Sequence, residues 1–155
     1  MPIRDIVLAI FLIGGLPVAL RYPFYGVCAY AWLGLMNPHR LTWGFSYDIQ
    51  WAFIYGVVTL AVLFTEKDRQ FMPAVYRFRV VLLYLAWMAI TNLFALEPGL
   101  AEGRLTEVFK VYLMAIVTLS MLTTERRIAI FTSVAVFSVG FFGIKGGWFT
   151  LQTGG

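Results

Sequence analysis

Residues able to bind an anionic, sugar-bearing ligand gather in the segment 36–44, Met-Asn-Pro-His-Arg-Leu-Thr-Trp-Gly. It contains His39, the single histidine of the chain, beside Arg40 and close to Trp43. A guanidinium binds phosphate or carboxylate through paired donors, and an imidazole acts as an acid or a base near neutral pH. Trp43 would stack on a sugar face or sit among lipid headgroups. The alternative is an Asn-Pro turn with His39 and Arg40 solvated and Trp43 as an interfacial anchor.

A second candidate is Lys145, which lies among glycines in the segment 140–148. Where a helix ends, such a stretch can form a concavity of backbone N–H groups that binds an anion. The segment lacks the glycine–lysine–hydroxyl order of a Walker loop, so nucleotide binding is not expected. The alternative is a flexible helix end whose lysine reaches back to the membrane interface.

Other chemistries find little support in the residues. One histidine, with no cysteine or carboxylate at ligand spacing, argues against a metal site, and no motif implies another cofactor. Cys28 is the single cysteine, which excludes an internal disulfide and suggests a small packing residue. The segment 97–107 mixes Glu and Arg and is interpreted as a solvated connector. Lys and Arg form no dense cluster, so nucleic acid is not an expected partner despite a net charge of +4.

The elements that carry these residues are long and apolar. Hydrophobic residues make up 61% of the 155 residues and charged ones 13%, against about 25% charged in an average soluble domain. A soluble domain of this length could not bury so much apolar surface. Six runs of about 14 to 17 residues contain no Asp, Glu, Lys or Arg: 6–20, 22–36, 49–64, 80–96, 111–124 and 128–144. They are apolar on every face, which favours helices over barrel strands. The sequence predicts an all-α, polytopic transmembrane bundle of about six helices in a lipid bilayer.

The first two runs are predicted to form a hairpin. A single helix over 6–36 would place Arg21 deep in the bilayer, at a large energetic cost. Pro23 disfavours helical geometry in the residue before it, which supports a break at this point. Each arm is short for a hydrocarbon core of about 30 Å, so a hairpin that only partly crosses is the alternative.

The distribution of basic residues predicts an orientation in the membrane. Arg21 and the segments 65–79 and 123–127 together carry seven of the twelve Lys and Arg residues. We expect this side to face the cytoplasm. The segments 37–48 and 97–107, with the residues after Lys145, are then expected on the outer face.

Three stretches together resemble a known family. They are residues 4–8, 35–44 and 143–150, and the middle one is the most specific. In this order and with this helix spacing, the chain resembles the O-glycosylation ligases associated with the exosortase A system. These belong to the O-antigen ligase and polymerase superfamily of bacterial inner membranes. The resemblance implies a multi-pass inner-membrane glycosyltransferase that moves a glycan from a polyprenyl-pyrophosphate carrier to a protein or lipid acceptor. Transfer would occur on the periplasmic side, without nucleotide sugar or metal.

The resemblance also limits what this chain can be expected to do. Members of that family continue into further helices and a large periplasmic loop, where the residues thought to do the chemistry lie. Residues 1–155 are therefore interpreted as one transmembrane region, an N-terminal fragment that is inactive alone, and the catalytic residues are expected beyond residue 155. The substrate-binding candidates are His39, Arg40, Trp43 and Lys145.

Two functions from other classes remain open. A non-enzymatic membrane subunit, packing into a larger complex, would need no site of its own. A small transporter is disfavoured, because none of the apolar runs carries a charged residue at membrane depth.

Overall fold

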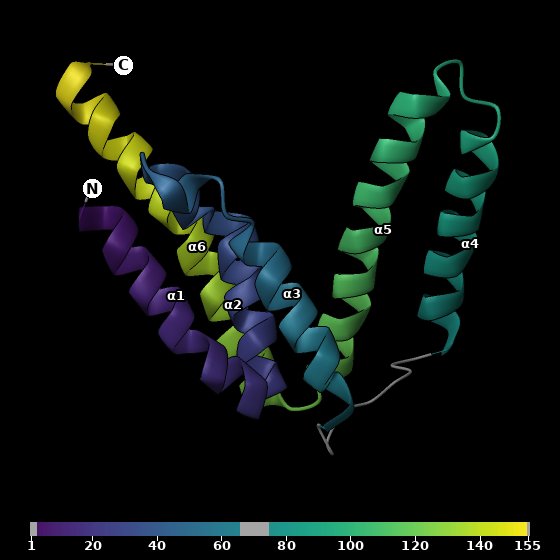
Figure 1. The fold of residues 1–155 in the computed structure, drawn as a ribbon, viewed down its shortest axis with the longest axis horizontal. Helices are drawn as coiled ribbons and strands as arrows, with labels where there is room; N and C mark the ends of the chain where they lie inside the picture. Colours follow the sequence, from purple (N-terminus) through teal and green to yellow (C-terminus); the bar gives the residue numbers. More distant parts are fainter. Residues whose placement is uncertain (1–2, 66–74, 155) are drawn as a thin grey trace. The chain divides into compact units, whose positions relative to one another are not determined.

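The computed structural model describes residues 3–65 and 75–154, apart from the side chains of 75–78. The described residues form six α-helices, with 3-10 turns at Pro38–Leu41, Phe45–Tyr47 and Leu63–Thr65 (Figure 1). The helices are α1 (Ile3–Arg21), α2 (Pro23–Met36), α3 (Trp51–Val62), α4 (Val75–Asn92), α5 (Pro98–Met121) and α6 (Glu125–Thr153). The predicted all-α class and the six helices are confirmed. Of the predicted basic segment 65–79, Lys67 and Arg69 lie outside the described residues.

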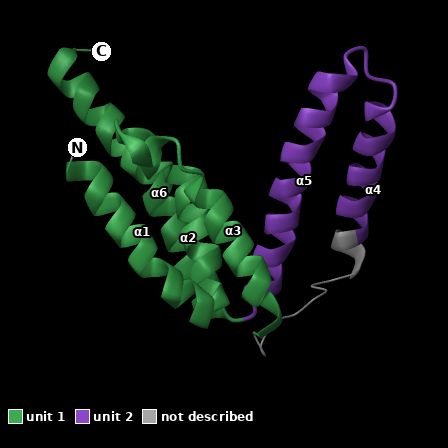
Figure 2. Ribbon diagram, in the orientation of Figure 1, with its two compact units in different colours: residues 1–67, 124–155 green, residues 68–123 purple. Residues whose placement is uncertain are grey.

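The helices belong to two compact units (Figure 2). One unit, Met1–Lys67 with Thr124–Gly155, holds α1, α2, α3 and α6, and α2 packs against the other three helices. The other unit, Asp68–Thr123, holds α4 and α5 as an antiparallel pair. In that pair the rings of Tyr84 and Tyr112 lie 6.0 Å apart between centroids.

The first two helices form the predicted hairpin. Between them only Tyr22 is non-helical, with an extended backbone at φ −133° and ψ 91°. Pro23 is the first residue of α2, where its missing N–H costs no hydrogen bond. α1 and α2 then run antiparallel and in contact (Figure 1).

Two helices are longer than their apolar runs, which corrects two interpretations. The segment 97–107 is not a loop, because α5 begins at Pro98 and its charged first half is helical. Glu, Leu and Arg have high helix propensity, so this segment can be helical without being apolar. An ion pair between Arg104 Nη1 and Glu107 Oε2, 3.5 Å apart and one turn along the helix, adds to this. Lys145 does not lie at a helix end, because α6 continues to Thr153. The residue that ends α6 is Gly154, in the left-handed conformation at φ 79°.

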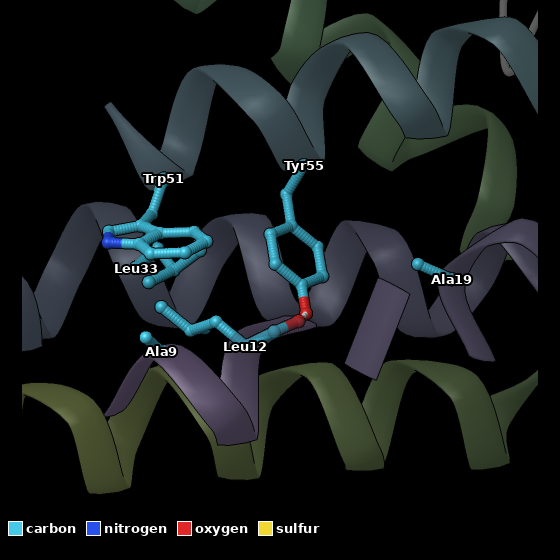
Figure 3. Packing of buried hydrophobic residues seen from close by; sticks show 6 residues of the cluster. All are labelled: Ala9, Leu12, Ala19, Leu33, Trp51 and Tyr55. Carbon is cyan, nitrogen blue, oxygen red and sulfur yellow. Dashed lines mark hydrogen bonds between the residues drawn. The ribbon is translucent and has the colours of Figure 1, made fainter. Parts of the chain in front are cut away.

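The core of the larger unit lies where α1, α2 and α3 meet (Figure 3). Its buried residues are Ala9, Leu12, Ala19, Leu33, Trp51 and Tyr55. The hydroxyl of Tyr55 donates to the carbonyl oxygen of Leu12 at 2.7 Å, so a polar atom is satisfied inside the apolar core. Gly15 leaves room for this phenol, because a Cβ at that position would lie 2.5 Å from the Tyr55 oxygen.

Among the described residues, α1 and α6 are long and apolar enough to cross a membrane, by length and composition. The apolar helices Trp51–Thr65 and Arg79–Asn92 are shorter.

The contact between Gly15 and Tyr55 can be tested by a double-mutant cycle. We expect Gly15→Ala to lower the free energy of unfolding by about 1–3 kcal/mol, because the new methyl group overpacks against the phenol oxygen. In the Tyr55→Phe background the nearest remaining ring atom would be 3.7 Å away, an ordinary contact, so the same substitution should cost much less. The measurement is denaturant unfolding of the purified protein.

Gly14 provides the matched control for this cycle. It is also helical but has no atom within 4 Å of its ideal Cβ position. Gly14→Ala should therefore be neutral or stabilise by up to about 1 kcal/mol. Equal effects of Gly15→Ala in both backgrounds would contradict the proposed packing.

Candidate anion-binding pocket

The loop that carries the first candidate residues begins with a helix cap. α2 ends at Met36, and Asn37 takes the left-handed conformation with φ 46° and ψ 52°. Its N–H donates to the carbonyl oxygen of Leu33, and its side-chain amide donates to that of Gly34 at 3.2 Å. Pro38 then begins a short 3-10 helix, Pro38–Leu41. The predicted Asn-Pro turn is confirmed, and it directs the chain from α2 across the end of α1.

A fully buried carboxyl group holds this loop against α1. Asp5, in the first turn of α1, accepts hydrogen bonds at Oδ1 from the N–H of Gly44, at 3.1 Å, and of Ser46, at 3.2 Å. The hydroxyl of Ser46 in turn accepts from the indole N–H of Trp51 at 3.0 Å. The N-terminal turn, the loop and the first residue of α3 are therefore joined by hydrogen bonds.

Gly44 favours this contact because it leaves space for the carboxyl group. A Cβ there would lie 3.0–3.1 Å from the three carboxyl atoms of Asp5. Its φ of −127° is one that any residue adopts, so the constraint is the approach of the carboxyl group and not the backbone angle.

An open pocket of about 780 Å³ lies beside this loop. Its cations come from three separate segments: Arg4 from α1, Arg40 from the loop and Lys145 from α6. Trp43, 83% exposed, also lines it. No Asp or Glu is among the lining residues that the structure describes. Three positive charges in a lining without Asp or Glu favour an anion, although the buried carboxyl group of Asp5 lies behind the loop at Gly44.

Arg40 is held in place by an aromatic side chain. Its Nη1 donates to the hydroxyl of Tyr47 at 3.1 Å, and its Cζ lies 5.2 Å from the centre of the same ring. Such a cation–π contact orients a guanidinium while leaving its other donors available.

The structure separates His39 from the other three candidates. His39 is only 8% exposed and does not line the pocket, so the solvated histidine of the alternative interpretation is wrong. Its Nδ1 is buried and has no hydrogen-bond partner among the described residues. Burial lowers the pKa of His39 from its usual 6.5, and the charge of neighbouring Arg40 lowers it further. Because His39 does not line the pocket, its imidazole is not placed to act as an acid or a base on a ligand there.

Two residues of the site were not among the sequence candidates. Arg4 and Asp5 appear in the motif 4–8, but neither was assigned a role. The partners of Asp5 lie 39 and 41 positions away, a separation that no local pattern reveals. The only signal was a pair of charges at the very start of an apolar run.

The other end of the same unit has its own basic surface. A cavity of about 570 Å³ there is lined by Tyr22, Thr65, Thr124, Arg126 and Arg127, among others. The predicted separation of Arg40 and Lys145 from the segment 123–127 is thus confirmed within this unit. In the part of the chain that the structure describes, no three His, Cys, Asp or Glu residues gather as a metal ion would need.

Fold and site together define an all-α protein with a cationic pocket at one end of a four-helix unit. The chain belongs to the family of unknown function DUF5935, whose model matches residues 3–155. No curated protein and no solved structure gives a significant match.

The Asp5 contact can be tested by releasing the loop. We expect Asp5→Ala to remove the acceptor of the buried N–H of Ser46 and of the partly buried N–H of Gly44, and Gly44→Ala to push against the carboxyl group. Each change should lower the free energy of unfolding by about 1–3 kcal/mol or more. Both should also speed trypsin cleavage after Arg40, measured by mass spectrometry of the fragments. Gly34→Ala is the control, because no atom lies within 4 Å of its ideal Cβ position. Unchanged cleavage in both Asp5 and Gly44 variants would contradict the contact.

The lowered pKa of His39 predicts a dependence of stability on pH. Since the folded state binds this proton less readily than the unfolded state, the unfolded state protonates first as the pH falls below about 6.5. Stability should decrease through that window and level off once the folded imidazole is also protonated. Unfolding of the wild type and of His39→Gln, followed between pH 5 and 8, gives the measurement. Above pH 7 the difference in unfolding free energy between the two proteins should not change with pH. If the difference also stayed constant between pH 7 and pH 5, the assignment would be overturned.

Proposed function

We propose that this chain is a multi-pass protein of the bacterial inner membrane whose cationic pocket binds the pyrophosphate of a polyprenyl-linked glycan. It would serve a ligase that transfers the glycan to a protein or lipid acceptor on the periplasmic side. The observation that carries the proposal is the meeting of Arg40 and Lys145, 105 positions apart in the chain, with Trp43 in one pocket.

The exposure of the long apolar helices supports a place in the membrane. α1 has 19 residues and so measures about 28 Å, close to the hydrocarbon thickness of a bilayer. Only 22% of its apolar stretch is buried within the protein, and only 6% of that of α6. A core helix of a soluble protein would be mostly buried. Apolar surface left open to this extent is stable in lipid and not in water.

The composition of the pocket supports a phosphate-bearing ligand. Guanidinium and ammonium groups form short, charge-assisted hydrogen bonds to phosphate oxygens. Arg4, Arg40 and Lys145 together match a group that carries more than one negative charge. Exposed Trp43 lies at the same pocket, where its ring could stack on the attached sugar or on headgroups.

The pocket supports assigning only one part of the reaction, the binding of the carrier, to this chain. When a glycan leaves its carrier, negative charge grows on the departing pyrophosphate, and fixed cations stabilise that charge. Activation of the acceptor requires a base, and buried His39 does not reach the pocket. We therefore assign to this chain the binding of the carrier, and the resemblance to the ligases implies that other residues supply the base.

The proposal predicts how the loss of two pocket cations changes the amount of lipid-linked glycan when the variant protein is expressed in its own cells. Arg40→Ala combined with Lys145→Ala should weaken carrier binding and so raise the amount of unused lipid-linked glycan by about tenfold or more. The measurement is glycan released from the organic-solvent extract of the membranes, at equal protein level by immunoblot.

Arg104→Ala is the matched control for charge. Arg104 is exposed on α5, pairs with Glu107 and does not line the pocket, so its loss should leave the lipid-linked glycan at the wild-type amount. Unchanged lipid-linked glycan in the double variant would overturn the ligase function. It would favour the alternative of a non-enzymatic membrane subunit.

A further inference from the structure

A second cavity continues from the cationic pocket along the bundle. It has a volume of about 680 Å³ and lies between α2 and α6, with Phe11 of α1 at its edge. Phe11, Trp32 and Phe141 line both cavities. The rings of Phe11 and Trp32 meet edge to face with centroids 5.8 Å apart. The two cavities therefore adjoin each other at these aromatic rings.

We call this second cavity the α2–α6 groove. It is apolar in character even where polar side chains line it. Ser133 and Ser138 line it, but each hydroxyl donates to the backbone of its own helix, to the carbonyl oxygens of Ala129 and Val134 respectively. The indole N–H of Trp32 is likewise directed to the sulfur of Met36 at 3.0 Å. Side chains satisfied in this way offer a ligand no strong polar partner, so the groove favours a hydrocarbon chain.

Small residues form part of the groove wall. Ala29 on α2 and Ala129 and Ser133 on α6 all line the cavity, and small side chains such as these leave a furrow between two helices that otherwise pack together. Ala129 and Ser133 are exposed, so the furrow is open along α6.

We propose that the pocket and the α2–α6 groove form one binding site for a single-chain lipid with a terminal phosphate or pyrophosphate. The phosphate lies among Arg4, Arg40 and Lys145, and the hydrocarbon chain lies in the groove. The inference rests on the proposed function for its head site and adds where, and by which residues, the chain of the carrier is recognised.

Charge decides between this ligand and the other occupants of an apolar groove. A helix of another protein could fill the groove, but it would bring no anion to the three cations in the pocket beside the groove. A bilayer phospholipid with a phosphodiester brings one negative charge and two chains to a site with three cations and one groove. A terminal phosphate or pyrophosphate on one chain carries close to two charges or more, and matches both features.

The test compares two ligands that share a head and differ in their chain. Purified protein in detergent should bind farnesyl pyrophosphate about tenfold or more tightly than isopentenyl pyrophosphate, because the longer chain buries more apolar surface in the groove. Ser133→Trp, which fills the furrow, should abolish this difference and leave the affinity for isopentenyl pyrophosphate within about twofold. Retained binding of the short ligand shows that the variant is folded. The measurement is equilibrium binding by native mass spectrometry or displacement of radiolabelled ligand.

Val139→Trp is the control of equal bulk, since Val139 is 58% exposed on α6 and does not line the groove. It should preserve the preference for the longer chain. Equal affinities of the wild type for the two pyrophosphates, or a preference that survives Ser133→Trp, would overturn the chain site alone. Equally effective competition by phosphatidylglycerol would also overturn it, in favour of a bulk-lipid site. Failure of both pyrophosphates to bind would overturn the head site, and with it the proposed function.

Discussion

The hydrogen bonds to the carboxyl group of Asp5 fix the shape of the pocket. Oδ1 of this fully buried group accepts two backbone N–H groups, from Gly44 and Ser46 in a loop about forty positions away, whereas Oδ2 has no partner among the described residues. The contact is close, because a Cβ at residue 44 would lie 3.0–3.1 Å from the carboxyl atoms. It ties the loop to the N-terminal turn, so that Arg40 and Trp43 line the same pocket as Arg4.

The packing of α2 against its neighbouring helices explains why the pocket forms at the end of this four-helix unit. α2 contacts α1, α3 and α6, and the core residues around Leu33 and Tyr55 hold α1 and α3 against it. Ser46 links the loop to this core through the indole of Trp51. The cations thus stand on α1, on the loop that packs against α1, and on α6, which packs against α2. Donors carried by packed elements lose less conformational freedom on binding an anion than donors on a mobile loop.

Local sequence patterns predicted the helices and three of the residues that line the pocket, but not the contacts that assemble it. Uncharged runs predicted six helices, and Pro23 predicted the hairpin, because both signals act over a few residues. Arg40, Trp43 and Lys145 were found from residue type alone. The bonds of Asp5 and the burial of His39 were missed, since each depends on tertiary packing between distant segments. The glycines near Lys145 were misleading: a glycine permits a helix to end without requiring it, and α6 continues to Thr153.

Under the proposed function, the charges of the pocket suit one part of a transfer reaction. Cations near a low-dielectric surface stabilise an anion more strongly than cations in bulk water, which would favour both the binding of a pyrophosphate and its departure from a glycan. Deprotonating an acceptor needs a base, and three positive charges would lower the pKa of any base placed among them. In the proposed reaction, a base would therefore act better from an element that approaches the sugar from the side away from Arg4, Arg40 and Lys145.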